Sequence, residues 1–202
     1  MPKNYELISQ SICEFRFDTD EKTFNALVVI TFKINGDISE IPVKFGKSLE
    51  FVKIVHRTQV GEDGGFFYSE NASNDAYSYD ESSEILSVKF DDLNTRTANA
   101  VSMEITIRGK IGNQQTGGPI YIDDDGVLIV DLKNDTHQVF PYLDTVETKF
   151  GLTVMVEEGR KFECDGEEPT TYYDDDNIIA YTPIIENNFG LNTLKFKVHP
   201  KQ

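Results

Sequence analysis

Alternation of apolar and polar residues with a period of two constrains this chain more than any other feature. Phe15 and Phe17 alternate with Glu14 and Arg16, and the segment 101–107 places Val, Met and Ile on one side and Ser, Glu and Thr on the other. Successive side chains of a β-strand point to opposite faces, so the pattern predicts strands with one dry and one wet face. Further strands are predicted at 28–34, 41–45, 49–55, 85–90, 101–111, 127–130, 150–156, 177–182 and 193–198.

Helical periodicity is nearly absent, since only 94–100 and 135–138 have patterns that would support a turn or two of helix. Strands do not alternate with helices, which excludes a parallel α/β sheet as the expected fold. The polar stretches 61–79, 113–119 and 165–177 are interpreted as loops within one domain, because none has the length or monotony of a tether. We therefore expect an all-β fold over residues 1–202, a large, saddle-like antiparallel β-sandwich of two packed sheets with little helix.

The charge of the chain limits its partners. Asp and Glu number 35 against 19 Lys and Arg, a formal net charge of −16. Such a chain repels phosphate backbones and anionic membranes, so no nucleic acid is expected as a partner. No apolar run approaches the ~18 residues of a membrane span. The first residues lack a secretory signal and the two cysteines are far apart, so a cytoplasmic location is expected, with a removed signal peptide as the alternative.

Two short turn signals stand between alternating runs. Asn35-Gly36 separates the predicted strands 28–34 and 41–45, and this dipeptide favours a two-residue hairpin because both residues tolerate positive φ. Asp123–Gly126 also reads as a hairpin turn. The alternative for this acidic stretch, and for Asp174–Asp176, is a calcium site, since calcium prefers oxygen ligands.

The sequence lacks complete motifs for phosphate binding, metal binding and nucleophilic catalysis. Gly46-Lys47-Ser48 ends like a phosphate-binding loop, but Ile41 replaces the first glycine and a strand follows, so a turn is expected. The three histidines, His56, His137 and His199, have no metal-ligand spacing, and the chain contains neither Gly-x-Ser-x-Gly nor His-Glu-x-x-His. Cys13 shares the alternating face of Phe15 and is predicted to be a buried thiol. We expect no catalytic, cofactor-binding or metal-binding residue.

Aromatic residues in the acidic stretches are the candidate partner-binding residues. Phe66, Phe67 and Tyr68 stand in one stretch, and Tyr172 and Tyr173 in another. Exposed aromatic side chains commonly anchor a protein partner. The alternative is that they fold back and pack over one end of the sandwich.

The order of the strand patterns resembles the N-terminal β-domain of the zinc metallo-aminopeptidases related to aminopeptidase N and leukotriene hydrolase. The resemblance covers roughly residues 10–198. It rests on a strand ending Ile105-Thr-Ile-Arg-Gly-Lys-Ile111, a loop closing at Pro119-Ile-Tyr121, the stretch Phe140–Asp144, and an alternating strand after Lys149. The family's best-known stretch there is Phe-Pro-Cys-x-Asp-Glu-Pro. The resemblance implies the β-domain fold of that family.

The departures from the family imply the loss of its chemistry. Tyr142 replaces the cysteine, Thr145-Val146 replaces Glu-Pro, and Val130–Lys133 lacks the family's Gln and Glu. The catalytic motifs are missing, and without metal ligands no water can be activated. The expected function is a non-catalytic protein-interaction or assembly module, whose partner carries Lys or Arg. Two alternatives are a detached N-terminal domain that acts only with a separate zinc aminopeptidase domain, and a calcium-dependent carbohydrate-binding module.

Overall fold

Strands dominate the computed structural model of the chain. The structure describes residues 4–35, 38, 40–60, 65–69, 77–89, 100–132, 136–143, 149–164, 169–174, 178–182 and 194–201. A short 3-10 turn, η3 (Thr136–Gln138), falls where the sequence predicts a helical turn. The other predicted turn, at 94–100, lies almost entirely outside the described residues. Within the described segments, no helix is long and apolar enough to cross a bilayer.

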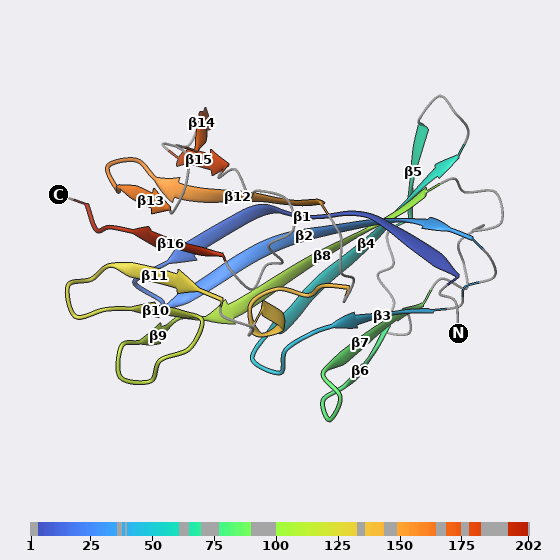
Figure 1. Cartoon of the computed structure of the whole chain (residues 1–202), viewed down its shortest axis with the longest axis horizontal. Helices are drawn as coiled ribbons and strands as arrows, with labels where there is room; N and C mark the ends of the chain where they lie inside the picture. Colours follow the sequence, from blue (N-terminus) through green and yellow to red (C-terminus); the bar gives the residue numbers. More distant parts are fainter. Residues whose placement is uncertain are drawn as a thin grey trace.

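A large sheet of eight strands forms the body of the molecule (Figure 1). Its neighbours are antiparallel except β1 and β12, which are parallel. Its order is β14 (Thr170–Asp174), β15 (Ile178–Thr182), β12 (Lys149–Glu157), β1 (Tyr5–Asp18), β2 (Thr23–Ile34), β8 (Ala100–Lys110), β4 (Glu50–Val60) and β5 (Gly65–Ser69).

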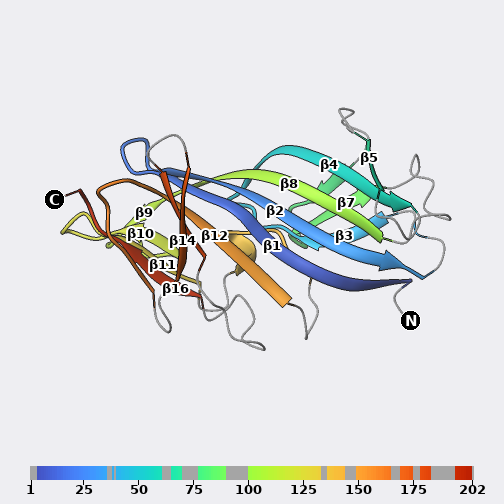
Figure 2. The same ribbon diagram turned by 90° about the horizontal axis from the view of Figure 1, so that it is seen from above.

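Two smaller sheets lie near opposite ends of the large sheet (Figures 1 and 2). The first has the order β13 (Phe162–Cys164), β16 (Lys195–Val198), β11 (Leu128–Asp131), β10 (Ile120–Ile122) and β9 (Gly112–Asn113). The second has the order β3 (Glu40–Lys44), β7 (Ile85–Lys89) and β6 (Tyr77–Asp80). The predicted all-β sandwich is confirmed, with the difference that its second layer is divided into two sheets.

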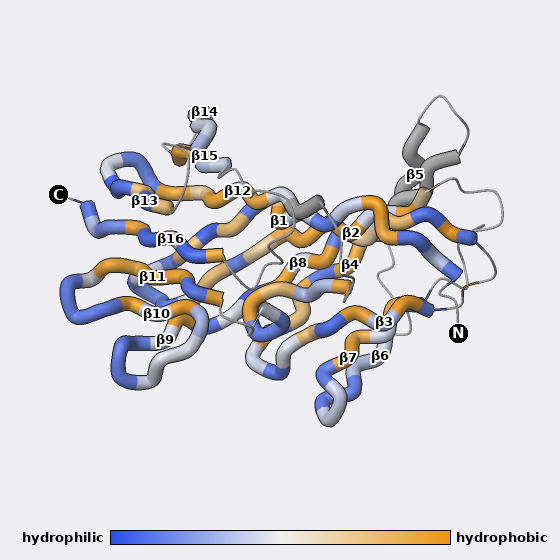
Figure 3. Tube along the Cα trace, viewed as in Figure 1, coloured by the Kyte–Doolittle hydropathy of each residue, from blue (hydrophilic) through white to orange (hydrophobic). Residues whose placement is uncertain are grey.

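One apolar core joins the three sheets. Phe15 of β1 is fully buried, and its ring lies 4.7 Å from that of Phe140 and 6.1 Å from that of Phe196 in β16. Toward the other end, the rings of Phe51 and Tyr77 are 4.3 Å apart and connect β4 to β6. Hydrophobic residues recur along the strands, interspersed with hydrophilic ones (Figure 3). The inner face of the large sheet is therefore covered by both small sheets.

A β-bulge in β1 overturns the prediction for Cys13. The register between β1 and β2 shifts between Ile12 and Glu14. Ile12 and Phe15 are consequently both buried, while Cys13 and Glu14 between them are both exposed. A bulge adds one residue to a strand, so the simple alternation that placed Cys13 beside Phe15 breaks at this point. The thiol lies on the outer face, 3.6 Å from the Ser11 hydroxyl.

The hairpin predicted at Asn35-Gly36 is also wrong. β2 pairs with β1 and β8, whereas β3 pairs with β7 in another sheet. Both edges of β2 are therefore occupied, and the next strand cannot pair with it. The backbone N–H of Asn35 instead donates to the carbonyl of Asn4, at 2.8 Å, and extends the pairing of β2 with β1.

Candidate functional site

The structure places both groups of candidate aromatic residues on strands. Phe66, Phe67 and Tyr68 belong to β5, and Tyr172 and Tyr173 belong to β14. The interpretation as loops is thus wrong for Gly65–Ser69 and Thr170–Asp174. Aromatic and β-branched residues favour extended pairing, which here prevails over the polar residues around them. The side chains of all these residues except Tyr172 lie outside what the structure describes.

The two aromatic strands are the opposite edges of the large sheet. β14 ends the sheet on one side and β5 on the other, with six strands between them. A single contact patch containing all five candidate residues is therefore not formed within one copy of the chain. The candidate site divides into two edges, of which β14 is the one with a described aromatic side chain, Tyr172.

Tyr172 lies on the outer face of the large sheet. It pairs in register with Ala180 of β15, and Ala180 pairs with Met155 of β12. On the neighbouring position of β15, Tyr181 stacks on Phe162, with rings 4.6 Å apart, on the inner face. Because neighbours alternate, Ala180 and Tyr172 lie on the face opposite to Tyr181, where Ala180 is fully buried. The Tyr172 side chain remains 50% exposed, which makes it available for contact.

A polar network around Glu84 connects two turns to η3. Its carboxylate accepts hydrogen bonds from the Gln138 side-chain amide, at 2.9 Å, and contacts Nε2 of His137, at 3.0 Å. The bond from Gln138 is the largest cause that lowers the pKa of Glu84 from its usual value of 4.5. Ser48 donates to the side-chain oxygen of Gln138, at 2.9 Å. Sequence reasoning missed this network, because its members are dispersed along the chain.

The turn at Gly46-Lys47-Ser48 is confirmed. It joins β3 of the small sheet to β4 of the large sheet. The Gly46 amide donates to the carbonyl of His137, at 2.7 Å, and a Cβ at Gly46 would collide with that oxygen. The glycine is therefore required by a close backbone approach.

The predicted turn at Asp123–Gly126 is confirmed as well. It connects the antiparallel strands β10 and β11, and Gly126 adopts a φ of 77°. One carboxylate oxygen of Asp123 accepts hydrogen bonds from the amides of Asp125, at 3.0 Å, and Val127, at 2.9 Å. This oxygen stabilises the turn itself. In the described part of the chain, no cluster of three or more His, Cys, Asp or Glu side chains could hold a metal ion.

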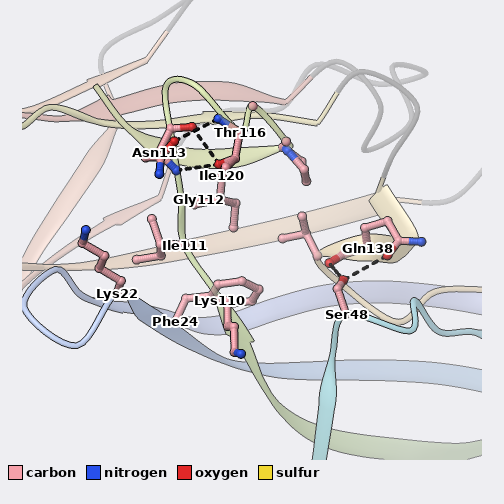
Figure 4. A pocket seen from close by; sticks show the side chains of 14 residues that line it. Lys22, Phe24, Ser48, Lys110, Ile111, Gly112, Asn113, Thr116, Ile120 and Gln138 are labelled. Carbon is pink, nitrogen blue, oxygen red and sulfur yellow. Dashed lines mark hydrogen bonds between the residues drawn. The ribbon is translucent and has the colours of Figure 1, made fainter. Parts of the chain in front are cut away.

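A pocket of about 490 Å³ opens between the β9–β10 loop and the β3–β4 turn (Figure 4). Buried apolar residues, among them Ile111 and Val139, line it. Some of its polar groups bond to one another: Ser48 bonds to Gln138, and the Thr116 amide bonds to Asn113. The side chains of Lys22 and Lys110 also line the pocket. The size suits a small molecule, but Ser48, Gln138, Thr116 and Asn113 already use polar atoms in bonds within the protein.

Comparison with known proteins adds no relative: no protein-family model and no curated protein matches this chain.

Proposed function

We propose that this chain is a non-catalytic interaction module that binds a protein partner through a strand edge of its large sheet. The observation that carries the proposal is the half-exposed Tyr172 on β14, which ends the large sheet. Tyrosine is enriched at the centres of protein interfaces, because it combines a large apolar ring with a hydrogen-bonding hydroxyl. The net charge of −16 favours a partner that presents Lys or Arg.

The residues that carry the resemblance to the aminopeptidase N-terminal domain support this proposal, because their roles are structural. Phe140 is fully buried in the common core. Gly109 pairs with Phe24, and a Cβ at Gly109 would overlap the ring of Phe24. Such positions preserve a fold whether or not chemistry accompanies it.

A second candidate, the detached N-terminal domain of a zinc aminopeptidase, rests on the same residues. The segment Val130–Lys133 favours the first candidate. In the family this segment carries a Gln and a Glu near the amino end of the substrate, whereas here Val130 and Leu132 are fully buried aliphatic residues. Buried aliphatic side chains cannot bind an ammonium group.

Affinity purification of the tagged native chain tests the proposal. We expect a stoichiometric protein partner, whose recovery falls with Tyr172→Ala and persists with Val52→Ala, a control at an equally exposed position of β4. Both variants should keep the melting temperature of the parent. A partner with a His-Glu-x-x-His motif would support the second candidate instead. Recovery unchanged by Tyr172→Ala would contradict the proposed surface.

A further inference from the structure

The open edges of the three sheets are not equally able to accept another strand. β9 and β13 are only two and three residues long. The edge of β3 contains Pro42, and Lys44 exchanges two backbone hydrogen bonds with Tyr142, at 2.8 and 3.1 Å. β6 is four residues long. Short strands, prolines and covered backbone groups are the usual protection of sheet edges.

Among the described residues, β14 has fewer of these protections, namely a proline, Pro169, directly before the strand. It has five residues, Thr170-Thr-Tyr-Tyr-Asp174, with neither proline nor lysine. Threonine and tyrosine are among the strongest strand formers. Within the described part of the chain, β14 pairs on one side only, through Thr170–Asp174 with β15. On the edge of β14 that faces away from β15, every second residue therefore directs its backbone N–H and C=O groups away from the sheet.

The acidic residues near β14 in the sequence indicate which kind of strand would pair with it. Glu167-Glu168 precede the strand and are separated from it by Pro169, Asp174 ends it, and Asp175-Asp176 follow. A second copy of this chain, paired antiparallel edge to edge, would bring the acidic ends of both strands together, which is unfavourable. A segment rich in Lys or Arg has the complementary charge. β5 is the other open edge of the large sheet, and its sequence, Gly65-Phe-Phe-Tyr-Ser69, has no charged residue.

We propose that β14 binds an extended, lysine- or arginine-rich segment of a partner protein as an added strand of the large sheet. This inference rests on the proposed function and specifies how the partner binds. Backbone hydrogen bonds supply the pairing, and the side chain of Tyr172 contacts alternate residues of the segment, which lie about 7 Å apart along a strand. The acidic residues that flank β14 fix the sign of the partner's charge.

Direct binding of short probes tests the sign of the charge. The probe is a fluorescein-labelled peptide, Lys-Thr-Val-Thr-Val-Thr-Lys, and its counterpart has Glu at both ends. Fluorescence anisotropy should give the Lys peptide an affinity about tenfold or more above that of the Glu peptide. Equal affinities would overturn the proposed partner chemistry.

Backbone methylation of the probe tests strand addition separately from charge. One version of the Lys peptide carries N-methyl groups on every second residue and another carries them on every residue, so their charge is the same. An added strand needs one edge with free N–H groups, which only the first version keeps. We expect the first version to bind like the parent peptide and the fully methylated version to lose binding by about tenfold or more. If the fully methylated version binds as well as the parent peptide, strand addition is wrong.

A pair of charge-matched variants locates the site. Tyr172→Lys places the usual protective residue of a sheet edge on β14, and Val52→Lys makes the same charge change at a position that is 53% exposed on β4. Binding of the Lys peptide should fall with the first variant and persist with the second. Equal loss in both would show non-specific attraction to an acidic protein.

A native partner that is still recovered with Tyr172→Lys would contradict this inference and leave the interaction function standing. A dimer of the parent chain in sedimentation, lost in Tyr172→Lys, would identify a second copy as the occupant and overturn the inference.

Discussion

The side-chain amide of Gln10 exchanges two hydrogen bonds with the backbone of Leu143. Its nitrogen donates to the Leu143 carbonyl, at 3.1 Å, and its oxygen accepts from the Leu143 amide, at 2.9 Å. Gln10 is 5% exposed and Leu143 is 2% exposed. The side chain thus provides the pairing that a neighbouring strand would otherwise supply, and it satisfies a backbone segment buried outside any sheet.

We expect Gln10→Leu to lower the free energy of unfolding by about 2–3 kcal/mol, because it leaves a buried N–H and a buried C=O without partners. Urea denaturation measures the change. Gln115→Leu, at an exposed loop position, is the control and should change little. If Gln10→Leu is as stable as the parent, the two hydrogen bonds do not contribute as the structure indicates.

Gly109→Ala should destabilise the protein by about 1–3 kcal/mol, because its Cβ would overlap the ring of Phe24 on the adjacent strand. The smaller side chain of Phe24→Leu should relieve this overlap. A double-mutant cycle followed by thermal unfolding is therefore expected to show a double variant more stable than the sum of the two single changes predicts. Strict additivity would mean that the ring of Phe24 does not limit the residue at Gly109.

The contribution of Glu84 to stability should depend on pH. Its folded-state pKa is below 4.5, chiefly because Gln138 donates a hydrogen bond to the carboxylate. A carboxylate whose pKa is lower in the folded state stabilises that state at pH values above its unfolded-state pKa. This stabilisation is lost as the pH falls from 4.5 through the folded-state pKa. The difference in unfolding free energy between the parent and Glu84→Gln should therefore be largest near neutral pH and decrease below pH 4.5.

Denaturant titrations at a series of pH values measure this difference. Glu81→Gln, which removes an exposed carboxylate from the same β6–β7 turn, controls for the loss of one negative charge. Should both variants respond identically to pH, the bond from Gln138 to Glu84 would not be the cause.

The position of Cys13 predicts its reactivity. Its thiol is exposed on the outer face of the sheet, whereas Cys164 is partly buried. In the native protein, a thiol reagent such as dithionitrobenzoate should modify Cys13 quickly and Cys164 slowly, because access limits the rate. Cys13→Ser should abolish the fast phase. If both thiols of the native chain react slowly, Cys13 is buried, as simple alternation without the bulge predicts.

The fold class and most strands could be predicted from the sequence, because alternation is a local property of each segment. The turns at Gly46–Ser48 and Asp123–Gly126 could also be predicted, since their chemistry is local. The bulge that exposes Cys13 could not, because an inserted residue has no distinct pattern when the strand is read alone. The same holds for Asn35, whose hairpin signal is overridden by the pairing of β2 with β8.

The candidate site likewise combines a residue that the sequence predicts with a position that only the fold provides. Sequence reasoning selected Tyr172 as an aromatic residue in an acidic stretch, and it could not place that residue on a sheet edge. The edge exists because β12 lies beside β1 as a parallel strand, with Ser9 opposite Lys149, and β15 and β14 follow outward from β12.

What the sequence determined by itself is the strand content, the net negative charge and the local turns, since strands and turns depend on residues near one another in the chain and the charge depends on composition alone. What only the tertiary structure decided is which strands are neighbours, which faces are covered and which strands end the large sheet. These depend on contacts between residues more than a hundred positions apart, such as Gln10 and Leu143, and no local pattern records them.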